Sequence, residues 1–289
     1  MPDSTTRRQS VQGSALTGMG AAAWTFAAER SGGAETTNPA REARLAMRRG
    51  DWSGPTVYKV PDHVQCNLVV LPRDLAYDFL LYCQRNPKPC PVIEVTDVGN
   101  PQPRFSAKGA DLRTDLPKYR IYRKGVLDRE VRQIKEHWRD DSVAFLIGSS
   151  LTFDQALVRA GVPRSKDVWV LNTAVPTVAA GRFKGRMVVT MRWMTPAQAV
   201  IATQLTGRFP ANHGAPIHLG DPAEIGADLR HPIYGTPVDQ IPDGLMPVFW
   251  ACGVTPQKVA EEAKPDLMIA HAPGHGFITD LKADQICLP

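Results

Sequence analysis

No stretch of this 289-residue chain approaches the roughly 18 consecutive apolar residues that a membrane-spanning helix needs. Outside the first 50 residues, 27 basic and 25 acidic residues nearly balance, and no basic stripe is interleaved with aromatic residues. The five cysteines form an odd set without a CxxC pair, which argues against a disulfide framework or a zinc knuckle. These absences argue against a membrane or nucleic-acid partner, and they predict reduced thiols.

The first 37 residues differ from the rest of the chain. Arg7 and Arg8 precede a mildly apolar stretch rich in Gly and Ala, which resembles a degraded twin-arginine export signal. The two positions after Gln9, usually bulky and apolar in such signals, hold Ser10 and Val11. We therefore expect residues 1–37 to form a flexible or loosely packed arm on a cytoplasmic protein, with export as the alternative.

From Asn38 onward, caps and periodicity predict the secondary structure. Asn38 as N-cap and Pro39 in the first turn predict a helix that Gly50 ends. Three further helices are expected to begin at threonine N-caps, namely Thr152, Thr195 and Thr255. The segments expected to be strands are "VQCNLVVLP", "PVIEVTD" and "SVAFLIG", with a hairpin in "YRIYRKGVLDRE".

The order of these elements predicts the fold class. Hairpins and Pro-rich turns interrupt any steady alternation of strand and helix, although 43% hydrophobic content is enough for a large core. We predict an α/β or α+β fold in residues 38–289, with a mixed β-sheet flanked by helices. A division into two lobes near residues 140–190 is the alternative to a single body.

Side chains suited to acid–base chemistry gather in two loops rich in Gly and Pro. The segment "GRFPANHGAPIHLGDP" contains His213, His218 and Asp221, and "HAPGHGFITD" contains His271, His275 and Asp280. Imidazole titrates near neutral pH and could act as acid or base. The alternative is that each histidine only donates to a loop carbonyl. The spacings match no standard metal motif, so we expect no cofactor, with a divalent metal held by these side chains as the alternative.

A second set of residues could bind a carboxylate. It comprises Lys88, Arg113, Arg208, and the residues Cys252, Gly253 and Thr255 at an expected helix start. Free backbone N–H groups at a helix start suit a carboxylate or an oxyanion. Cys252 could be an activated thiolate there or only a small buried residue. Arg113 could equally belong to an ion-pair strip with its acidic neighbours.

Several long strings together resemble the bacterial hydro-lyase family that includes D-glutamate cyclase. They are "VQCNLVVLPRDLAYDFLLYCQRNPKPCPVIEVTDVG", "DLRTDLPKYRIYRKG", "FLIGSSLTFDQAL", "RFPANHGAPIHLGDP", "MPVFWACGVTPQ" and "HAPGHGFITDL", in order over roughly Asn38 to Leu281. The resemblance implies that the amine of D-glutamate closes onto its side-chain carboxylate with loss of water, giving 5-oxo-D-proline. That chemistry needs a base, an acid and groups that hold carboxylates. The four histidines are the acid–base candidates, Asp221 and Asp280 would orient them or act as acids, and the cations would hold carboxylates.

The chain also departs from the family's pattern in "LNTAVPTVAAGRF". Asn172 stands where the family has Arg, Ala174 where it has Asn, and Val178 where the residue is commonly basic. Loss of two cations weakens the case for a dicarboxylate, because a site that lacks its polar partners discriminates against the original ligand.

We therefore expect a hydro-lyase-type enzyme of amino-acid metabolism or specialised biosynthesis. Its substrate would be a small molecule related to D-glutamate but less anionic, and a homo-oligomer is an option. The alternative is a non-catalytic small-molecule-binding protein that keeps the fold. Retention of all four histidines argues against that alternative, because a binding protein has no need for several groups that titrate near neutral pH.

Overall fold

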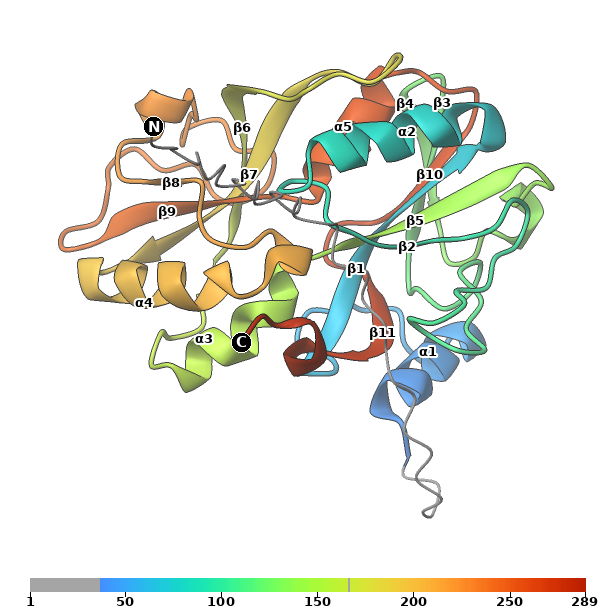
Figure 1. Cartoon of the computed structure of the whole chain (residues 1–289), viewed down its shortest axis with the longest axis horizontal. Helices are drawn as coiled ribbons and strands as arrows, with labels where there is room; N and C mark the ends of the chain where they lie inside the picture. Colours follow the sequence, from blue (N-terminus) through green and yellow to red (C-terminus); the bar gives the residue numbers. More distant parts are fainter. Residues whose placement is uncertain (1–36, 166) are drawn as a thin grey trace, which may run out of the picture. The chain divides into compact units, whose positions relative to one another are not determined.

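The computed structural model describes residues 37–165 and 167–289, and Thr37–Pro289 forms one compact unit. The N-terminal arm expected from the sequence lies outside the described residues. The described residues contain five α-helices and eleven β-strands. The strands form two sheets whose strand pairs are all antiparallel (Figure 1). Of the two fold classes that the sequence allowed, the α+β class is confirmed. No helix in the described part is long and apolar enough to cross a membrane.

The larger sheet has seven strands in the order β2-β5-β1-β10-β3-β4, with β11 also paired to β1. The apolar strands at its centre were predicted from the sequence, and β1 pairs with β5 along its length, from Cys66 opposite Gly148 to Pro72 opposite Ser142. Its strands are β1 (His63–Pro72), β2 (Val92–Val95), β3 (Tyr119–Arg123), β4 (Val126–Val131), β5 (Ser142–Gly148), β10 (Met268–His271) and β11 (Phe277–Lys282).

The smaller sheet has four strands in the order β6-β7-β9-β8. The chain leaves the larger sheet after β5, forms the smaller sheet, and returns to the larger sheet with β10. These strands are β6 (Trp169–Pro176), β7 (Arg186–Met194), β8 (His218–Leu219) and β9 (Met246–Ala251).

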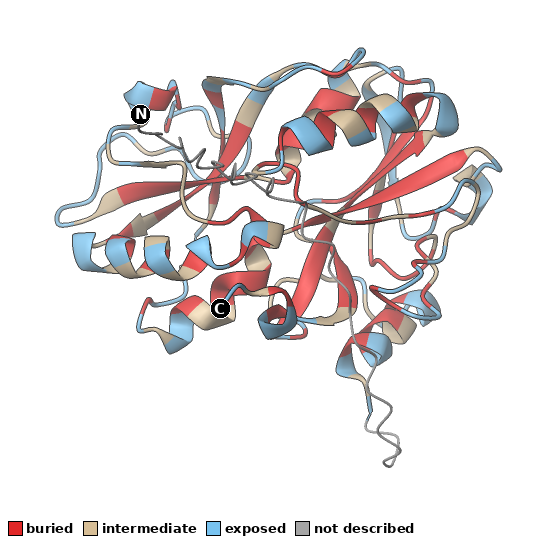
Figure 2. Ribbon diagram, in the orientation of Figure 1, coloured by how far each residue is buried: buried red, intermediate tan, exposed pale blue. Residues whose placement is uncertain are grey.

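Helices cover both sheets. Helices α2 and α5 lie side by side over one face of the larger sheet, where Phe79 and Val259 pack with Val69 (Figure 1). Helices α3 and α4 pack on the smaller sheet around Trp250, and the strands β1, β5 and β9 are buried along most of their length (Figure 2). The helices are α1 (Pro39–Arg49), α2 (Arg73–Arg85), α3 (Asp154–Arg159), α4 (Pro196–Gly207) and α5 (Val254–Glu262).

The predicted helix caps were partly right. The Asn38 side chain accepts from two backbone N–H groups of α1, and Thr195 forms a capping box with Gln198 at the start of α4. Thr152 and Thr255 do not cap helices, which corrects the prediction. The Thr152 hydroxyl accepts from the Gln65 backbone instead, 3.1 Å away, and Thr255 lies inside the first turn of α5.

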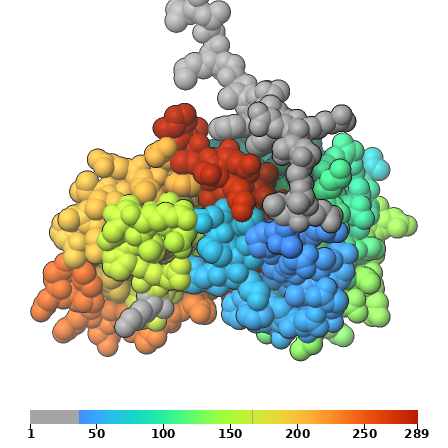
Figure 3. All heavy atoms as spheres, turned by 90° about the horizontal axis from the view of Figure 1, so that it is seen from below, coloured from blue at the N-terminus to red at the C-terminus, as the bar shows by residue number. Residues whose placement is uncertain are grey.

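The C-terminal residues bind to Arg208, at the end of α4. Leu288 donates its N–H to the Arg208 carbonyl over 2.7 Å, and its own carbonyl accepts from the Arg208 side chain over 2.9 Å. Figure 3 shows the C-terminal segment, in red, beside the yellow segment that contains α4.

All five cysteines are unpaired.

Candidate active site

The motif "HAPGHG" interrupts a strand. Both β10 and β11 pair antiparallel with β1, since Val69 lies opposite Ala270 and Cys66 opposite Phe277. The two strands therefore run along the same edge of β1, and residues 272–276 form an excursion between them. Pro273 lacks a ladder N–H and Gly274 has a φ of 75°, so the local sequence cannot continue the strand. The histidines of this motif thus lie where the strand pairing along this edge of β1 is interrupted.

The 272–276 excursion is held in place at several points. The Gly274 carbonyl accepts from the Thr56 backbone N–H over 2.8 Å, and Ala272 donates its N–H to the Lys118 carbonyl over 3.0 Å. A turn within it is closed by the His275 N–H, which donates to the Ala272 carbonyl over 2.9 Å. The excursion is therefore a shaped loop with defined side-chain directions.

The His271 side chain bonds to β1 beside the place where the excursion interrupts the strand pairing. Its Nδ1 accepts from the Leu68 N–H over 3.2 Å and lies 2.7 Å from Nε2 of Gln257, which belongs to α5. Because a backbone N–H can only donate, the neutral ring carries its proton on Nε2. Burial lowers the pKa of His271 to about 4. His271 is therefore a neutral hydrogen-bond donor at neutral pH.

His275 has the opposite arrangement. Its Nδ1 lies 2.7 Å from the Pro273 carbonyl, which can only accept, so Nδ1 carries the proton and Nε2 is the basic atom of the neutral ring. The ring is only partly buried. The charge of His275 contributes to the lowered pKa of His271, in line with two rings on one short segment. One motif thus presents one donor imidazole and one acceptor imidazole.

A half-buried lysine lies on the other side of β1. The Lys88 carbonyl accepts from Nδ1 of His213 over 2.9 Å, so the buried imidazole holds the turn that carries Lys88. Burial lowers the pKa of Lys88. Burial also lowers the pKa of His213 to about 4, although hydrogen bonds to the backbone of Lys88 and Gly148 raise it. No acidic side chain among the described residues pairs with the Lys88 ammonium. Such an ammonium suits an incoming carboxylate.

Two glycines bring these parts together. A β-carbon at Gly148, at the end of β5, would overlap the Ala211 carbonyl in the loop before His213. A β-carbon at Gly253, before α5, would overlap the side-chain amide of Asn67 on β1. Because β10, β1 and β5 are successive neighbours, and His271 lies opposite Leu68 while Gly148 lies opposite Cys66, the backbones at His271 and Gly148 are two strand spacings and two residues apart, about 12 Å. A small amino-acid-like molecule can span this distance.

The helix start at Gly253 differs from the prediction. The backbone φ and ψ angles of Gly253 are already helical. The Thr255 hydroxyl donates to the Val188 carbonyl over 3.2 Å and accepts from the Val188 N–H over 2.9 Å. Thr255 therefore ties α5 to β7 and does not face a ligand. Burial raises the pKa of the Cys252 thiol, which favours the small buried residue over the activated thiolate.

Three of the predicted catalytic side chains lie elsewhere. His218 is on edge strand β8 opposite Phe249, and its Nε2 donates to the Asp221 carbonyl over 2.7 Å. The Asp221 carboxylate accepts from the Ala223 N–H over 2.9 Å. Asp280 accepts from Arg44 over 2.8 Å and from Asn38 over 2.9 Å, so it anchors the start of α1. Five residues separate it from His275, about 16 Å along an extended chain.

Two of the predicted cations are already engaged, and Val178, one of the positions that depart from the family's pattern, lies near Lys88. Arg113 forms a two-point ion pair with Asp111, with Nη2 2.8 Å from Oδ2. Arg208 holds the C-terminal segment, as described above. Val178 is 57% exposed, and both its backbone N–H and its carbonyl bond to the Asn86 side chain over 2.8 Å, two residues before Lys88. Asn172 is exposed on β6.

Sequence reasoning missed Asn67 and Gln257. Asn67 is a polar residue inside the apolar run "VQCNLVVLP", and that exception is the signal that could have found it. Gln257 has no comparable signal, because a glutamine on a short helix is ordinarily solvent-exposed. Its role depends on α5 lying against the end of β10.

No group of three or more His, Cys, Asp or Glu side chains in the described residues is arranged to hold a metal ion. His271 and His213 each use Nδ1 for a partner in the protein. The donor set that the sequence suggested for a metal is therefore spread over separate places in the fold.

The two buried histidines predict that acid destabilises the protein. Free imidazole titrates near pH 6.5 in the unfolded chain, whereas the pKa values of His213 and His271 are about 4 in the folded chain. Between these pH values the unfolded chain binds more protons, so the free energy of unfolding falls as pH drops, by up to about 1.4 kcal/mol per pH unit for each histidine. Urea unfolding from pH 7 to pH 4.5 measures this slope.

The matched control for that slope is a histidine on the surface. His271→Gln should flatten the slope, whereas His231→Gln should not, because the His231 side chain is 82% exposed. Equal slopes in the wild type and His271→Gln would contradict the assignment of a buried neutral imidazole.

Comparisons with known proteins place the chain among similar sequences. Residues 143–280 match the family described as D-glutamate cyclase. A "Putative hydro-lyase" of Thermoanaerobacter sp. (strain X514) is 55% identical over 251 residues, which cover 85% of this chain and 94% of that protein. Similar proteins from Geobacillus kaustophilus and Bacillus subtilis are 53% and 50% identical, over 85% and 86% of this chain and 95% and 98% of theirs.

The structural comparison is much weaker. A nitrogen repressor-like protein from Methanococcus jannaschii is 10% identical, with a TM-score of 0.36 over 79% of this chain and 90% of that one. A score this low does not establish a common fold.

Proposed function

Because this chain belongs to the family of bacterial hydro-lyases that includes D-glutamate cyclase, we propose that it is a lyase that eliminates water from an amino-acid-like carboxylate as a lactam closes. One observation carries the proposal. The strand interruption at 272–276 and the residue before it supply imidazoles with opposite tautomers, His271 as a donor and His275 as an acceptor. Lactam closure needs both roles at one place.

The roles follow from the two tautomers. Nε2 of His275 takes a proton from the substrate ammonium, and the freed amine attacks the side-chain carboxyl carbon. Nε2–H of His271 donates to the oxygen that gains negative charge in the tetrahedral intermediate. The ammonium loses two protons in all, and His275 delivers them to the oxygen that leaves as water. The C–N bond that forms and the C–O bond that breaks share the same carbon atom.

The cations decide which carboxylates the site accepts. Lys88 is the one cation among the described candidates that is half-buried and free of an ion pair, so it serves one carboxylate. A basic residue at Val178 would put a second cation beside the Lys88 turn, because Asn86 holds the Val178 backbone. Without it, a second carboxylate would be desolvated without a partner, which is costly. We therefore propose a substrate with one carboxylate fewer than D-glutamate.

The test is a substrate panel. We expect slow or absent cyclisation of D-glutamate, and faster cyclisation of D-glutamate whose α-carboxylate is capped as an amide. The double variant Asn172→Arg with Val178→Arg should raise kcat/KM for D-glutamate by about tenfold or more, the effect of restoring a charge-assisted pair. Lactam formation followed by mass spectrometry measures both.

A matched double variant controls for added positive charge. Asn172→Gln with Val178→Gln keeps similar bulk without charge and should leave the preference unchanged. Efficient D-glutamate turnover by the wild type, unimproved by the arginine variant, would show that these positions do not set specificity. Binding of the panel without any turnover would favour the non-catalytic alternative. The same assay after exhaustive chelation is expected to give unchanged turnover, because imidazole proton transfer supplies the chemistry proposed.

A further inference from the structure

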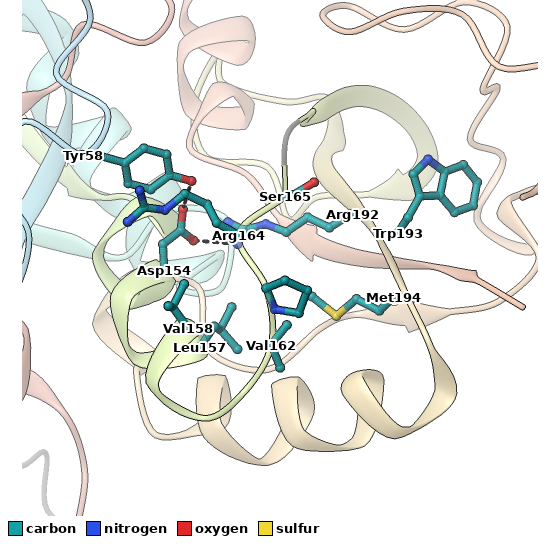
Figure 4. A pocket seen from close by; sticks show the side chains of 11 residues that line it. Tyr58, Asp154, Leu157, Val158, Val162, Arg164, Ser165, Arg192, Trp193 and Met194 are labelled. Carbon is teal, nitrogen blue, oxygen red and sulfur yellow. Dashed lines mark hydrogen bonds and ion pairs between the residues drawn. The ribbon is translucent and has the colours of Figure 1, made fainter.

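A buried polar network joins β7 to α3 (Figure 4). Nη1 of Arg192 lies 2.6 Å from Oδ1 of Asp154, and the Tyr58 hydroxyl donates to the other carboxylate oxygen over 2.9 Å. The cavity beside these groups has a volume of about 10 Å³, which is room for no more than a water molecule. This network therefore holds elements of the fold together and leaves no room for a ligand.

The side chain that bears on the proposed reaction comes from α5. Nε2 of Gln257 lies 2.7 Å from Nδ1 of His271 and also donates to the Leu68 carbonyl over 3.4 Å. Because a carbonyl oxygen can only accept, this second contact fixes which end of the amide faces the ring. Nδ1 of His271 accepts from the Leu68 N–H as well, over 3.2 Å. Two donors therefore meet at this ring nitrogen, and Gln257 is the nearer one.

These two donors decide which nitrogen of the neutral ring carries the proton. Burial first, and then the charges of His275 and Arg120, lower the pKa of His271 to about 4, so the ring is neutral. None of these three causes distinguishes Nδ1 from Nε2. A donor at Nδ1 does, because it requires a lone pair there and places the proton on Nε2. No described residue bonds to Nε2, so its N–H is left for a ligand.

The position of Gln257 depends on both sheets. Thr255, two residues earlier in α5, exchanges hydrogen bonds of 3.2 and 2.9 Å with Val188 on β7 of the smaller sheet. His271 belongs to β10 of the larger sheet. A short helix that is tied to one sheet thus delivers a donor to an imidazole of the other.

We propose that Gln257 is a positioning residue, which holds His271 in the Nε2–H tautomer and directs that N–H at the oxygen that gains charge as the lactam closes. The catalytic part of this inference rests on the proposed function, whereas the tautomer does not. A carboxylate in place of the amide would accept from the ring, so the proton would move to Nδ1. One reversed hydrogen bond would then turn the donor imidazole into an acceptor.

Nitrogen NMR of the full chain, labelled with ¹⁵N in the histidine rings, tests the tautomer at pH 7. His271→Gln identifies the two signals of this ring. Nε2 should be protonated in the wild type, and Nδ1 should be protonated in Gln257→Glu. Lys258→Gln is the matched control, because it makes α5 more negative by the same single charge on a side chain that is 42% exposed. It should keep the wild-type tautomer.

The kinetic test uses D-glutamate whose α-carboxylate is capped as an amide. Gln257→Glu should lower kcat by about 100-fold, the effect of losing an oxyanion donor, and leave KM nearly unchanged. Gln257→Met leaves the Leu68 N–H as the only donor, so the tautomer should persist while kcat falls by about tenfold, because the ring is held less firmly. Lys258→Gln should keep full turnover.

The two readouts separate this proposal from the proposed function. A protonated Nδ1 in the wild type, or the same tautomer in Gln257→Glu as in the wild type, would overturn the role of Gln257. Wild-type kcat in Gln257→Met would overturn it as well. The expected change of tautomer in a chain that forms no lactam would support the role of Gln257 in fixing the ring and contradict only the proposed lyase activity.

Discussion

His275→Ala is expected to lower kcat by about 100-fold or more and to leave the free energy of unfolding nearly unchanged. The ring is partly exposed, and its one hydrogen bond in the protein is local, from Nδ1 to the Pro273 carbonyl. Removing it leaves no buried partner unsatisfied, while the proposed proton carrier is lost. Single-turnover lactam formation with the best substrate of the panel measures the effect on the chemical step.

His231→Ala is the control for loss of a surface imidazole and should keep full turnover. Small primary amines or imidazole added to His275→Ala should restore part of the rate, because an external base can enter a partly exposed site. His213 is unsuited to this test, since it is buried, has a φ of 79° and holds the Lys88 turn, so its loss affects the fold. Wild-type kcat in His275→Ala would remove His275 from the mechanism.

Arg192→Met is expected to lower the free energy of unfolding by about 3–5 kcal/mol, the usual consequence of removing one partner of a buried ion pair. The variant strands the Asp154 carboxylate, whose side chain is 4% exposed, with only the Tyr58 hydroxyl as a donor. Burying that charge without its cation costs more than the packing that methionine restores. Urea unfolding, with the slope checked for change, measures the difference.

Two further variants distinguish the buried charge from a general loss of packing. Arg192→Met combined with Asp154→Leu and Tyr58→Phe removes every member of the network, so most of the lost stability should return. Arg159→Met breaks the surface pair with Asp62, whose side chains are 63% and 38% exposed, and should cost no more than about 1 kcal/mol. Equal losses in Arg192→Met and the combined variant would show that the pair is not what stabilises this region.

Two Thr-Pro sequences show how far local sequence determines a helix start. Thr195 and Thr255 are each followed directly by a proline. A glutamine comes two residues after the first proline and one residue after the second, and both threonines were predicted to be N-caps. Thr195 is extended, with a ψ of 159°, and caps α4. At Thr255 the chain has already turned at Gly253, whose φ and ψ are −65° and −3°, so the hydroxyl lies inside the helix. Gly253 lies against the side-chain amide of Asn67, which is far away in sequence.

The candidate site shows the same limit. The sequence by itself determined that "HAPGHG" could not be a continuous strand, because Pro273 and Gly274 forbid it. It predicted both histidines in one loop, whereas the structure places His271 at the end of β10 and only His275 in the loop. It could not determine which strand they would face or which ring nitrogen would carry the proton. Those depend on the backbone N–H of Leu68 and the carbonyl of Pro273.

The choice among the predicted cations was likewise decided only by tertiary structure. Lys88, Arg113 and Arg208 have the same charge in the sequence, and only Arg113 has an acidic neighbour, Asp111, close enough in the chain to suggest its ion pair. Folding brings the Leu288 carbonyl to Arg208 and leaves Lys88 half-buried and unpaired. Caps, turns and apolar runs act over a few neighbouring residues, so the sequence determined the elements. Contacts between residues far apart in the chain set ionisation, tautomer and pairing, so only the folded chain determined the site.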